Sequence, residues 1–253
     1  MNRLFTFGCS FTQYWRWPTW ADMLGREADI FENWGLCGAG NSYIFYSLIE
    51  CHERYRIEAG DTIMIMWTNT SREDRYVGNR WIEGGNVYWE GHPLGRDYVR
   101  AWACERGYLI RDLATITAAR HLLNSWQCDW RFLSMVPLHS SNQASELGDN
   151  PALPNGPDDD VRQFYQSTLE LIYPSVYETV FGNQWNSGLG IADVNDSRRR
   201  DFHPTPIEHM TYIDTVLPGL ITAASREWMR EQDRLARAGQ LDWQQPNRPH
   251  GRL

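Results

Sequence analysis

The stretch "TIMIMW" (62–67) is an unbroken apolar run that follows the turn "EAGD" (58–61). Such a run, bounded by turn residues, is typical of a strand that is buried on both faces, as in a parallel sheet. Three further stretches predict strands of the same sheet: "RLFTFG" (3–8), "DIFENWG" (29–35) and "WRFLSMV" (130–136).

Helical patterns separate these strands along the chain. They cover residues 18–25, 43–56 and about 97–127, and two more follow the last strand at 160–173 and 205–239, the latter kinked near Pro218 and Gly219. Strands that alternate with helices predict an α/β fold in which helices cover both faces of a parallel sheet. The length of 253 residues favours a single domain, which we expect over residues 1–238.

Two segments depart from this alternation. After the third strand, "RWIE" (80–83) and "NVYW" (86–89) flank Gly84 and Gly85, which predicts an inserted hairpin. Residues 239–253 carry no periodic pattern and are expected to form a flexible C-terminal tail that is either disordered or attached by a few side chains.

The charge composition excludes several kinds of partner and cofactor. The formal net charge is -8, and all 24 basic residues are arginine. An acidic chain without a long basic run lacks the positively charged surface that binds nucleic acid or an anionic membrane. The lack of lysine removes Schiff-base chemistry, pyridoxal phosphate and the phosphate-binding loop lysine, so we expect no cofactor.

The cysteines and histidines give no metal or disulfide pattern. Five cysteines are scattered and never form a C-x-x-C pair, and the seven histidines are not clustered at metal-ligand spacing. The sequence also has no apolar run that could span a bilayer and no secretion signal of the common kind. We therefore expect a cytoplasmic protein with reduced thiols, no metal and no membrane partner.

Polar residues follow the predicted strands, at the edge where an open parallel sheet binds ligands. Ser10 follows the first strand, Gly38 lies in the glycine-rich turn after the second, and Asn69 follows the third. Asp201 and His203 precede the last helix. A hydroxyl, a base, a carboxylate and oxyanion donors are the groups that acyl transfer through a serine requires.

Four blocks in this order resemble the SGNH (GDSL-like) hydrolases. They are "TFGCSFT" (6–12), "NWGLCGAGNS" (33–42), "MWTNT" (66–70) and "DFHP" (201–204). The resemblance spans about residues 4 to 215. It implies a flavodoxin-like three-layer α/β/α sandwich that hydrolyses or transfers ester-linked acyl groups.

The resemblance also implies a role for each matching residue. Ser10 would be the nucleophile and His203 its base, oriented by Asp201. The backbone amides of Ser10 and Gly38 and the side chain of Asn69 would form the oxyanion hole.

Two positions depart from the family pattern. Trp67 stands where the family usually has a glycine, two residues before the asparagine, and one residue instead of two separates Asp201 from His203. Because Pro204 disfavours a helical conformation of His203, we expect an extended segment in which Asp201 and His203 project to the same side.

Each site residue also has a structural interpretation. Ser10 could cap the following segment, and Asn69 could close a turn through its own side chain. His209 is the second candidate for the base, although its place inside a helix favours a packing role. Cys9 and Cys37 flank the predicted site and could be reactive, although thiols beside apolar neighbours are more often inert.

Three functions therefore remain open on this scaffold. The first is a serine esterase that acts on a small-molecule or carbohydrate ester, such as an O-acetyl sugar, with Trp67, Trp81 and Trp89 lining the substrate. The second is an O-acyltransferase, which differs only in the acceptor of the acyl group. The third is a catalytically inactive carbohydrate-binding or structural protein.

Overall fold

A parallel sheet of four strands forms the centre of the computed structural model, which describes residues 2–82, 84–139, 158–182, 190–192, 200–201 and 203–244. The strand order is β2-β1-β3-β6, and each neighbouring pair is parallel. The strands are β1 (Arg3–Phe7), β2 (Ile30–Asn33), β3 (Asp61–Trp67) and β6 (Asp129–Ser134). The α/β fold with a central parallel sheet is thus confirmed.

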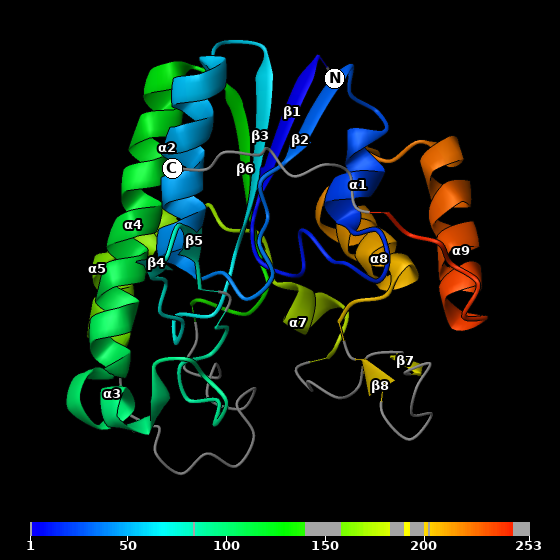
Figure 1. Ribbon diagram of the computed structural model, residues 1–253. Coiled ribbons are helices and arrows are strands. Elements are labelled where there is room, and N and C mark those ends of the chain that lie inside the picture. The colour runs from blue at the N-terminus through cyan, green and yellow to red at the C-terminus, as the bar shows by residue number, and fades with distance from the viewer. Residues whose placement is uncertain are drawn as a thin grey trace.

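Helices lie on both faces of the sheet (Figure 1). On one face, α2 packs against α4, with α5 beside them; on the other face, α8 packs against α1 and α9. The helices are α1 (Trp20–Gly25), α2 (Asn41–Tyr55), α3 (Gly95–Trp102), α4 (Glu105–Trp126), α5 (Asp159–Phe164), α6 (Gln166–Leu169), α7 (Val176–Thr179), α8 (Pro206–Val216) and α9 (Ala223–Arg237). The three layers enclose the hydrophobic core.

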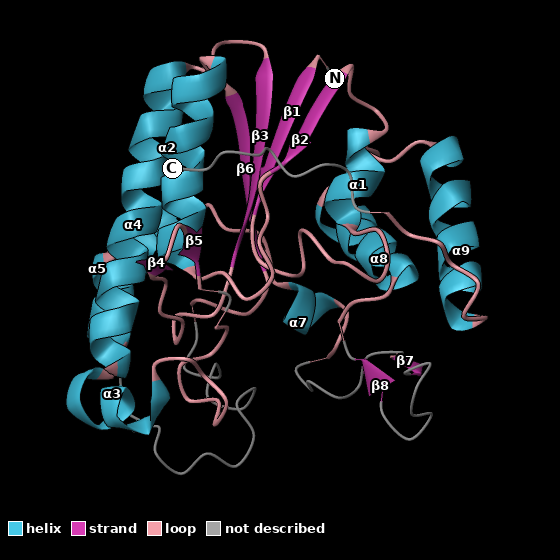
Figure 2. Cartoon of the chain, viewed as in Figure 1, coloured by secondary structure: helices cyan, strands magenta, loops and turns pink. Residues whose placement is uncertain are grey.

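The central strands are buried on both faces, as the apolar run 62–67 predicts. In β3, the side chains from Ile63 to Trp67 are at most 1% exposed. Figure 2 shows that the loops after β1, β2 and β3 gather at the carboxyl edge of the sheet. The polar residues that follow the strands therefore lie at one edge.

Three predicted helices are divided in the structure. Ala103 and Cys104 are extended and separate α3 from α4, where the sequence predicts one helix over 97–127. The predicted helix 160–173 ends with α6, and Ile172 instead forms a parallel bridge with Phe132 of β6. The break near Pro218 is confirmed: it separates α8 from α9, and Gly219 has a φ of +86°.

The inserted hairpin is present but lies earlier than predicted. It pairs β4 (Tyr76–Val77) with β5 (Arg80–Trp81), and its turn consists of Gly78 and Asn79. Both turn residues have positive φ, +57° and +65°, as a two-residue turn of this kind requires. The predicted turn at Gly84 and Gly85 is wrong, because Val77 pairs with Arg80 and the two strands are joined at Gly78 and Asn79.

The described beginning of the C-terminal tail is attached to the domain. Trp243 donates from Nε1 to the backbone oxygen of Tyr14 at 3.2 Å, and its ring centroid lies 6.2 Å from that of Trp228. The predicted flexible tail 239–253 is therefore attached to the rest of the protein as far as Trp243. The remainder, 245–253, lies outside the described residues.

Candidate active site

Ser10 lies in a tight turn directly after β1. The amides of Thr12 and Gln13 both donate to the carbonyl of Cys9, at 2.9 and 3.0 Å. The turn needs glycine at position 8, because a Cβ there would lie 2.0 Å from Oγ1 of Thr12. Ser10 is 5% exposed, and its hydroxyl contacts a histidine, whereas the N-cap of α1 is Thr19. The capping interpretation of Ser10 is therefore not supported.

Ser10, His203 and Asp201 form a continuous chain of polar contacts. Nε2 of His203 lies 3.0 Å from Oγ of Ser10, and Nδ1 lies 2.8 Å from Oδ1 of Asp201. The backbone amide of His203 donates to the same carboxylate oxygen at 3.0 Å. The carboxylate and the imidazole thus lie together in spite of their short sequence spacing.

The structure on either side of His203 restrains this segment. Asp201 ends β8 (Arg200–Asp201), which pairs antiparallel with β7 (Ile191–Ala192). On the other side, α8 begins with Pro206, and the Thr205 and Glu208 side chains form a reciprocal capping box. His203 is held between a strand and a capped helix.

Sequence reasoning missed two further partners of Asp201. The Tyr14 hydroxyl donates to Oδ2 of Asp201, and Arg16 donates from Nη1 to the same oxygen at 3.0 Å. Burial alone would raise the pKa of Asp201, but the hydrogen bonds from His203 and Tyr14 outweigh it and hold this pKa well below its usual range. Asp201 is therefore a carboxylate at neutral pH.

Three candidate oxyanion donors lie in the turns after β1, β2 and β3. The turn after β2 places Gly38 at a φ of +77°. Oδ1 of Asn69 accepts from the Ser71 amide at 2.6 Å, which leaves Nδ2 of Asn69 as the donor. Among the described residues, neither this Nδ2 nor the backbone amides of Ser10 and Gly38 donate a hydrogen bond to a protein acceptor. Asn69 thus closes its own turn and still offers an N–H.

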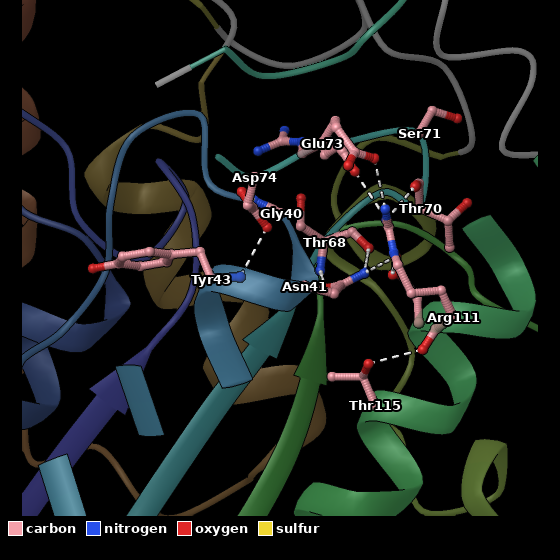
Figure 3. A network of polar contacts seen from close by, with 12 residues as sticks. Gly40, Asn41, Tyr43, Thr68, Thr70, Ser71, Glu73, Asp74, Arg111 and Thr115 are labelled. Carbon is pink, nitrogen blue, oxygen red and sulfur yellow. Dashed lines mark hydrogen bonds and ion pairs between the residues drawn. The ribbon is translucent and has the colours of Figure 1, made fainter. Parts of the chain in front are cut away.

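A buried carboxylate ties the glycine-rich turn to the loop after β3. Asp74 accepts from the backbone amides of Gly40, at 2.7 Å, and Tyr43, at 2.8 Å (Figure 3). Arg72 donates from Nη1 to the carbonyl of Ala39 at 2.8 Å. The two turns that carry Gly38 and Asn69 are therefore joined.

A second set of contacts ties the end of β3 to helices α2 and α4. Oδ1 of Asn41 accepts a hydrogen bond from the Thr68 amide at 2.9 Å. Its Nδ2 donates to the Thr68 carbonyl at 3.0 Å and to Oδ2 of Asp112 at 2.7 Å. Arg111 donates to the carbonyls of Thr70 and Arg72 (Figure 3). Burial raises the pKa of Asp112 to about 6, although Arg111 partly offsets this effect.

The three tryptophans expected to line the substrate differ in their surroundings. Trp67 is fully buried and packs edge-on against Phe132 at 5.4 Å, so this expectation is wrong for Trp67, which belongs to the core. Trp81 is partly buried and stacks on Tyr46 at 5.7 Å. Trp89 is 63% exposed and has a ring accessible to a ligand.

The insertion that carries Trp81 and Trp89 contacts the candidate site. The amide of Gly85 donates to the carbonyl of Gly38 at 3.1 Å, and the amide of Val87 donates to the backbone carbonyl of Ser71 at 2.8 Å. These bonds connect the insertion to the turns that carry Gly38 and Asn69.

His209 and the two flanking cysteines occupy structural positions. His209 is 1% exposed and meets Phe11 edge-on, and its Nδ1 has no hydrogen-bond partner among the residues that the structure describes. Burial, together with the charge of His203, lowers the pKa of His209 to about 3. Cys9 is fully buried with its Sγ 3.7 Å from the sulfur of Met135, whereas Cys37 is partly exposed.

The described ranges contain neither a metal-ligand cluster nor a membrane-spanning helix. No group of three or more His, Cys, Asp or Glu residues in them could hold a metal ion. None of the helices in the same ranges is long and apolar enough to cross a bilayer.

Comparison with known proteins gives only distant similarities. No protein-family profile and no curated protein matches the chain. A solved structure of a lipolytic G-D-S-L family protein from Veillonella parvula is similar, with 13% identity, coverage of 86% of this chain and 98% of that chain, and a TM-score of 0.45.

Two further solved structures show the same degree of similarity. A psychrotrophic esterase from Pseudoalteromonas sp. is 11% identical, with coverage of 91% and 100% and a TM-score of 0.44. A GDSL-like lipase from Bacteroides thetaiotaomicron is 11% identical, with coverage of 91% and 88% and a TM-score of 0.42.

Proposed function

We propose that this chain is a serine hydrolase of SGNH type that cleaves small acyl esters. The observation that carries the proposal is the chain of contacts from Oγ of Ser10 through His203 to Asp201, with lengths of 3.0 and 2.8 Å. Both distances lie within the reach of about 2.6–3.2 Å that proton transfer between nucleophile and base requires. Its order of hydroxyl, imidazole and carboxylate is that of serine hydrolases on unrelated folds.

In the proposed reaction, Oγ of Ser10 attacks the ester carbonyl carbon while Nε2 of His203 takes the hydroxyl proton. The tetrahedral intermediate collapses, the C–O bond to the alcohol breaks, and His203 returns the proton to the leaving alcohol. Water then attacks the acyl-enzyme with the same base and releases the acid. Oδ1 of Asp201 accepts from Nδ1, which keeps Nε2 free to receive the proton.

The developing oxyanion would be stabilised by three N–H donors. These are the amides of Ser10 and Gly38 and Nδ2 of Asn69. Donors held in place before the reaction need no reorganisation as charge develops, and each is worth roughly 10²-fold to 10³-fold in kcat. The contacts of Asp74 and Asn41 support this proposal, because they restrain the turns that carry Gly38 and Asn69.

The exposed ring of Trp89, on the insertion that is hydrogen-bonded to the Gly38 turn, supports a proposal about the substrate class. We propose a small acyl ester of an alcohol or carbohydrate, with the exposed ring of Trp89 as a stacking surface for a sugar. Transfer to a hydroxyl acceptor would use the same acyl-enzyme, so an O-acyltransferase remains the second candidate.

A fluorophosphonate probe tests the serine assignment. We expect covalent labelling of the wild-type protein and hydrolysis of p-nitrophenyl acetate, and we expect both to be lost in Ser10→Ala with the fold intact by circular dichroism. Cys9→Ala is the matched control for the neighbouring thiol and should still be labelled. Absence of labelling in a folded wild-type sample would favour the inactive binding protein.

A further inference from the structure

Sequence reasoning assigned no role to the segment "YWRW" (14–17), yet three of its residues contact the segment that carries the candidate base. Tyr14 and Arg16 contact Asp201, and Trp17 donates from Nε1 to the carbonyl of Pro204 at 2.9 Å. We propose that Tyr14 and Arg16 are positioning residues that hold the Asp201–His203 pair in its reactive geometry. This inference rests on the proposed function.

Tyr14 contacts both members of the pair. Its ring lies parallel to the His203 imidazole, with a centroid distance of 4.2 Å and an interplanar angle of 19°. Its hydroxyl donates to Oδ2 of Asp201. Tyr14 is 3% exposed, so the surrounding protein holds the phenol ring in place. The stack restrains the imidazole plane, and the hydroxyl restrains the carboxylate that hydrogen-bonds to it.

Arg16 adds a positive charge at the same carboxylate oxygen. Its Nη1 lies 3.0 Å from Oδ2 of Asp201, and the two side chains are only 13% and 14% exposed. A carboxylate withdrawn from water to this extent needs a charged or hydrogen-bonding partner to remain ionised. The guanidinium carbon lies 5.2 Å from the centre of the Trp17 ring, which helps to fix Arg16.

Together the contacts determine the rotation of the carboxylate. Oδ1 of Asp201 accepts from the backbone amide and Nδ1 of His203, and Oδ2 accepts from Tyr14 and Arg16. Without the second pair of donors, the carboxylate could rotate about its Cβ–Cγ bond and weaken its contact with Nδ1. The short spacing between Asp201 and His203 makes this support important, because two neighbours in an extended segment do not by themselves fix each other's side chains.

The protonation state of Tyr14 suits this role. Burial, with a smaller contribution from its hydrogen bond to Asp201, raises the pKa of Tyr14 far above its ordinary value. The phenol therefore stays protonated and can donate throughout the pH range in which an esterase is assayed.

Four variants separate the contributions of ring, hydroxyl and charge. Tyr14→Phe keeps the stack and removes the hydroxyl, and Tyr14→Leu removes both. Arg16→Lys keeps the charge, and Arg16→Gln removes it. Tyr55→Phe is the matched control, because Tyr55 lies at the opposite edge of the sheet, where its carbonyl accepts from Arg3.

With an activated short-chain ester, we expect kcat to fall about tenfold in Tyr14→Phe and about 10²-fold in Tyr14→Leu, with KM nearly unchanged, because small misplacements of reacting groups are costly. Arg16→Gln should also lower kcat about tenfold. Arg16→Lys should restore most of kcat.

Two outcomes would overturn the inference while leaving the proposed function intact. One is a wild-type protein with Ser10-dependent turnover whose Tyr14→Phe and Arg16→Gln variants both stay within twofold of it in kcat. The other is a change confined to KM, which would mean that these residues contact substrate.

A spectroscopic measurement tests the positioning role independently of turnover. The proton on Nδ1 of His203 should give a downfield NMR signal in the wild-type, Tyr55→Phe and Arg16→Lys proteins, and the signal should shift or broaden in Tyr14→Phe and Arg16→Gln. If the wild-type protein lacks Ser10-dependent turnover, the proposed function fails and this signal alone decides the positioning role. An unchanged signal in both variants contradicts it.

Discussion

Asn69 divides its carboxamide between two tasks. Its oxygen accepts from the Ser71 amide and closes the turn, while its nitrogen is left to donate. The structural and functional interpretations of this residue are therefore compatible, since they use different atoms. A substitution can separate them.

We expect Asn69→Asp to lower kcat by about 10²-fold to 10³-fold, because aspartate keeps the oxygen that accepts from Ser71 but replaces the oxyanion donor with an acceptor. Asn69→Ala should lose a similar amount of activity and also some stability, since the turn loses its acceptor. Steady-state kinetics and urea unfolding of both variants provide the test. A change in KM alone in Asn69→Asp would show that the nitrogen positions substrate.

Only part of the candidate site could be predicted at this scale. Ser10, His203 and Asp201 stand out because each follows or precedes an element that ends at the same sheet edge. Tyr14 could not be found this way, because one ring in the aromatic-rich segment 14–17 does not differ in sequence from residues that pack the core. Trp67 stands two residues before Asn69 in sequence, but as the last residue of β3 its side chain is fully buried in the core.

Among the elements, β3, α2 and α4 meet at Asn41, the first residue of α2. Asn41 satisfies both backbone groups of Thr68 and one oxygen of Asp112, which is 0% exposed. Buried polar groups that lose their partners cost about 1–3 kcal/mol each. The residue thus couples the stability of the helix layer to the position of the Asn69 turn.

Asn41→Ala should destabilise the protein by about 2–4 kcal/mol and lower kcat at least tenfold, because the Thr68 amide and carbonyl and the Asp112 carboxylate all lose a partner. Ser47→Ala is the matched control on the same helix: Ser47 is 3% exposed, but its hydroxyl only bonds the carbonyl of Ile44. Chemical unfolding and kinetics measure both quantities. Wild-type kcat in a folded Asn41→Ala protein would contradict the coupling.

Among the strands, β3 is the one that the sequence predicts most clearly, since its burial on both faces corresponds to an unbroken apolar run. Breaks within the helices were harder to predict from the sequence. The residues around Ala103 and Cys104 include no proline and no glycine at the break, so the pattern over 97–127 reads as one helix. The hairpin turn was predicted at the wrong position because the pairs Gly78–Asn79 and Gly84–Gly85 both permit positive φ. The local sequence does not show which pair forms the turn.

For the whole molecule, buried ionisable groups make stability depend on pH in two opposing ways. Burial raises the pKa values of Asp22 and Asp112 to about 6, so their contribution to stability is lost as pH rises through that value. His209 acts in the opposite direction. Its folded pKa of about 3 lies below its ordinary value of 6.5, so the unfolded chain takes up the proton first.

His209→Leu isolates this second effect, because the variant shares both buried aspartates with the wild-type protein. The contribution of neutral His209 is fully present above pH 6.5 and is lost as pH falls toward 3. Between pH 7.5 and 4.5, the wild-type free energy of unfolding should therefore fall by about 2–3 kcal/mol relative to the variant. Urea unfolding at several pH values measures this difference, with kcat at pH 7.5 as a check that the variant retains its site. A difference that does not change with pH would mean that His209 binds a proton in the folded protein and is less isolated from charge than its burial under Phe11 indicates.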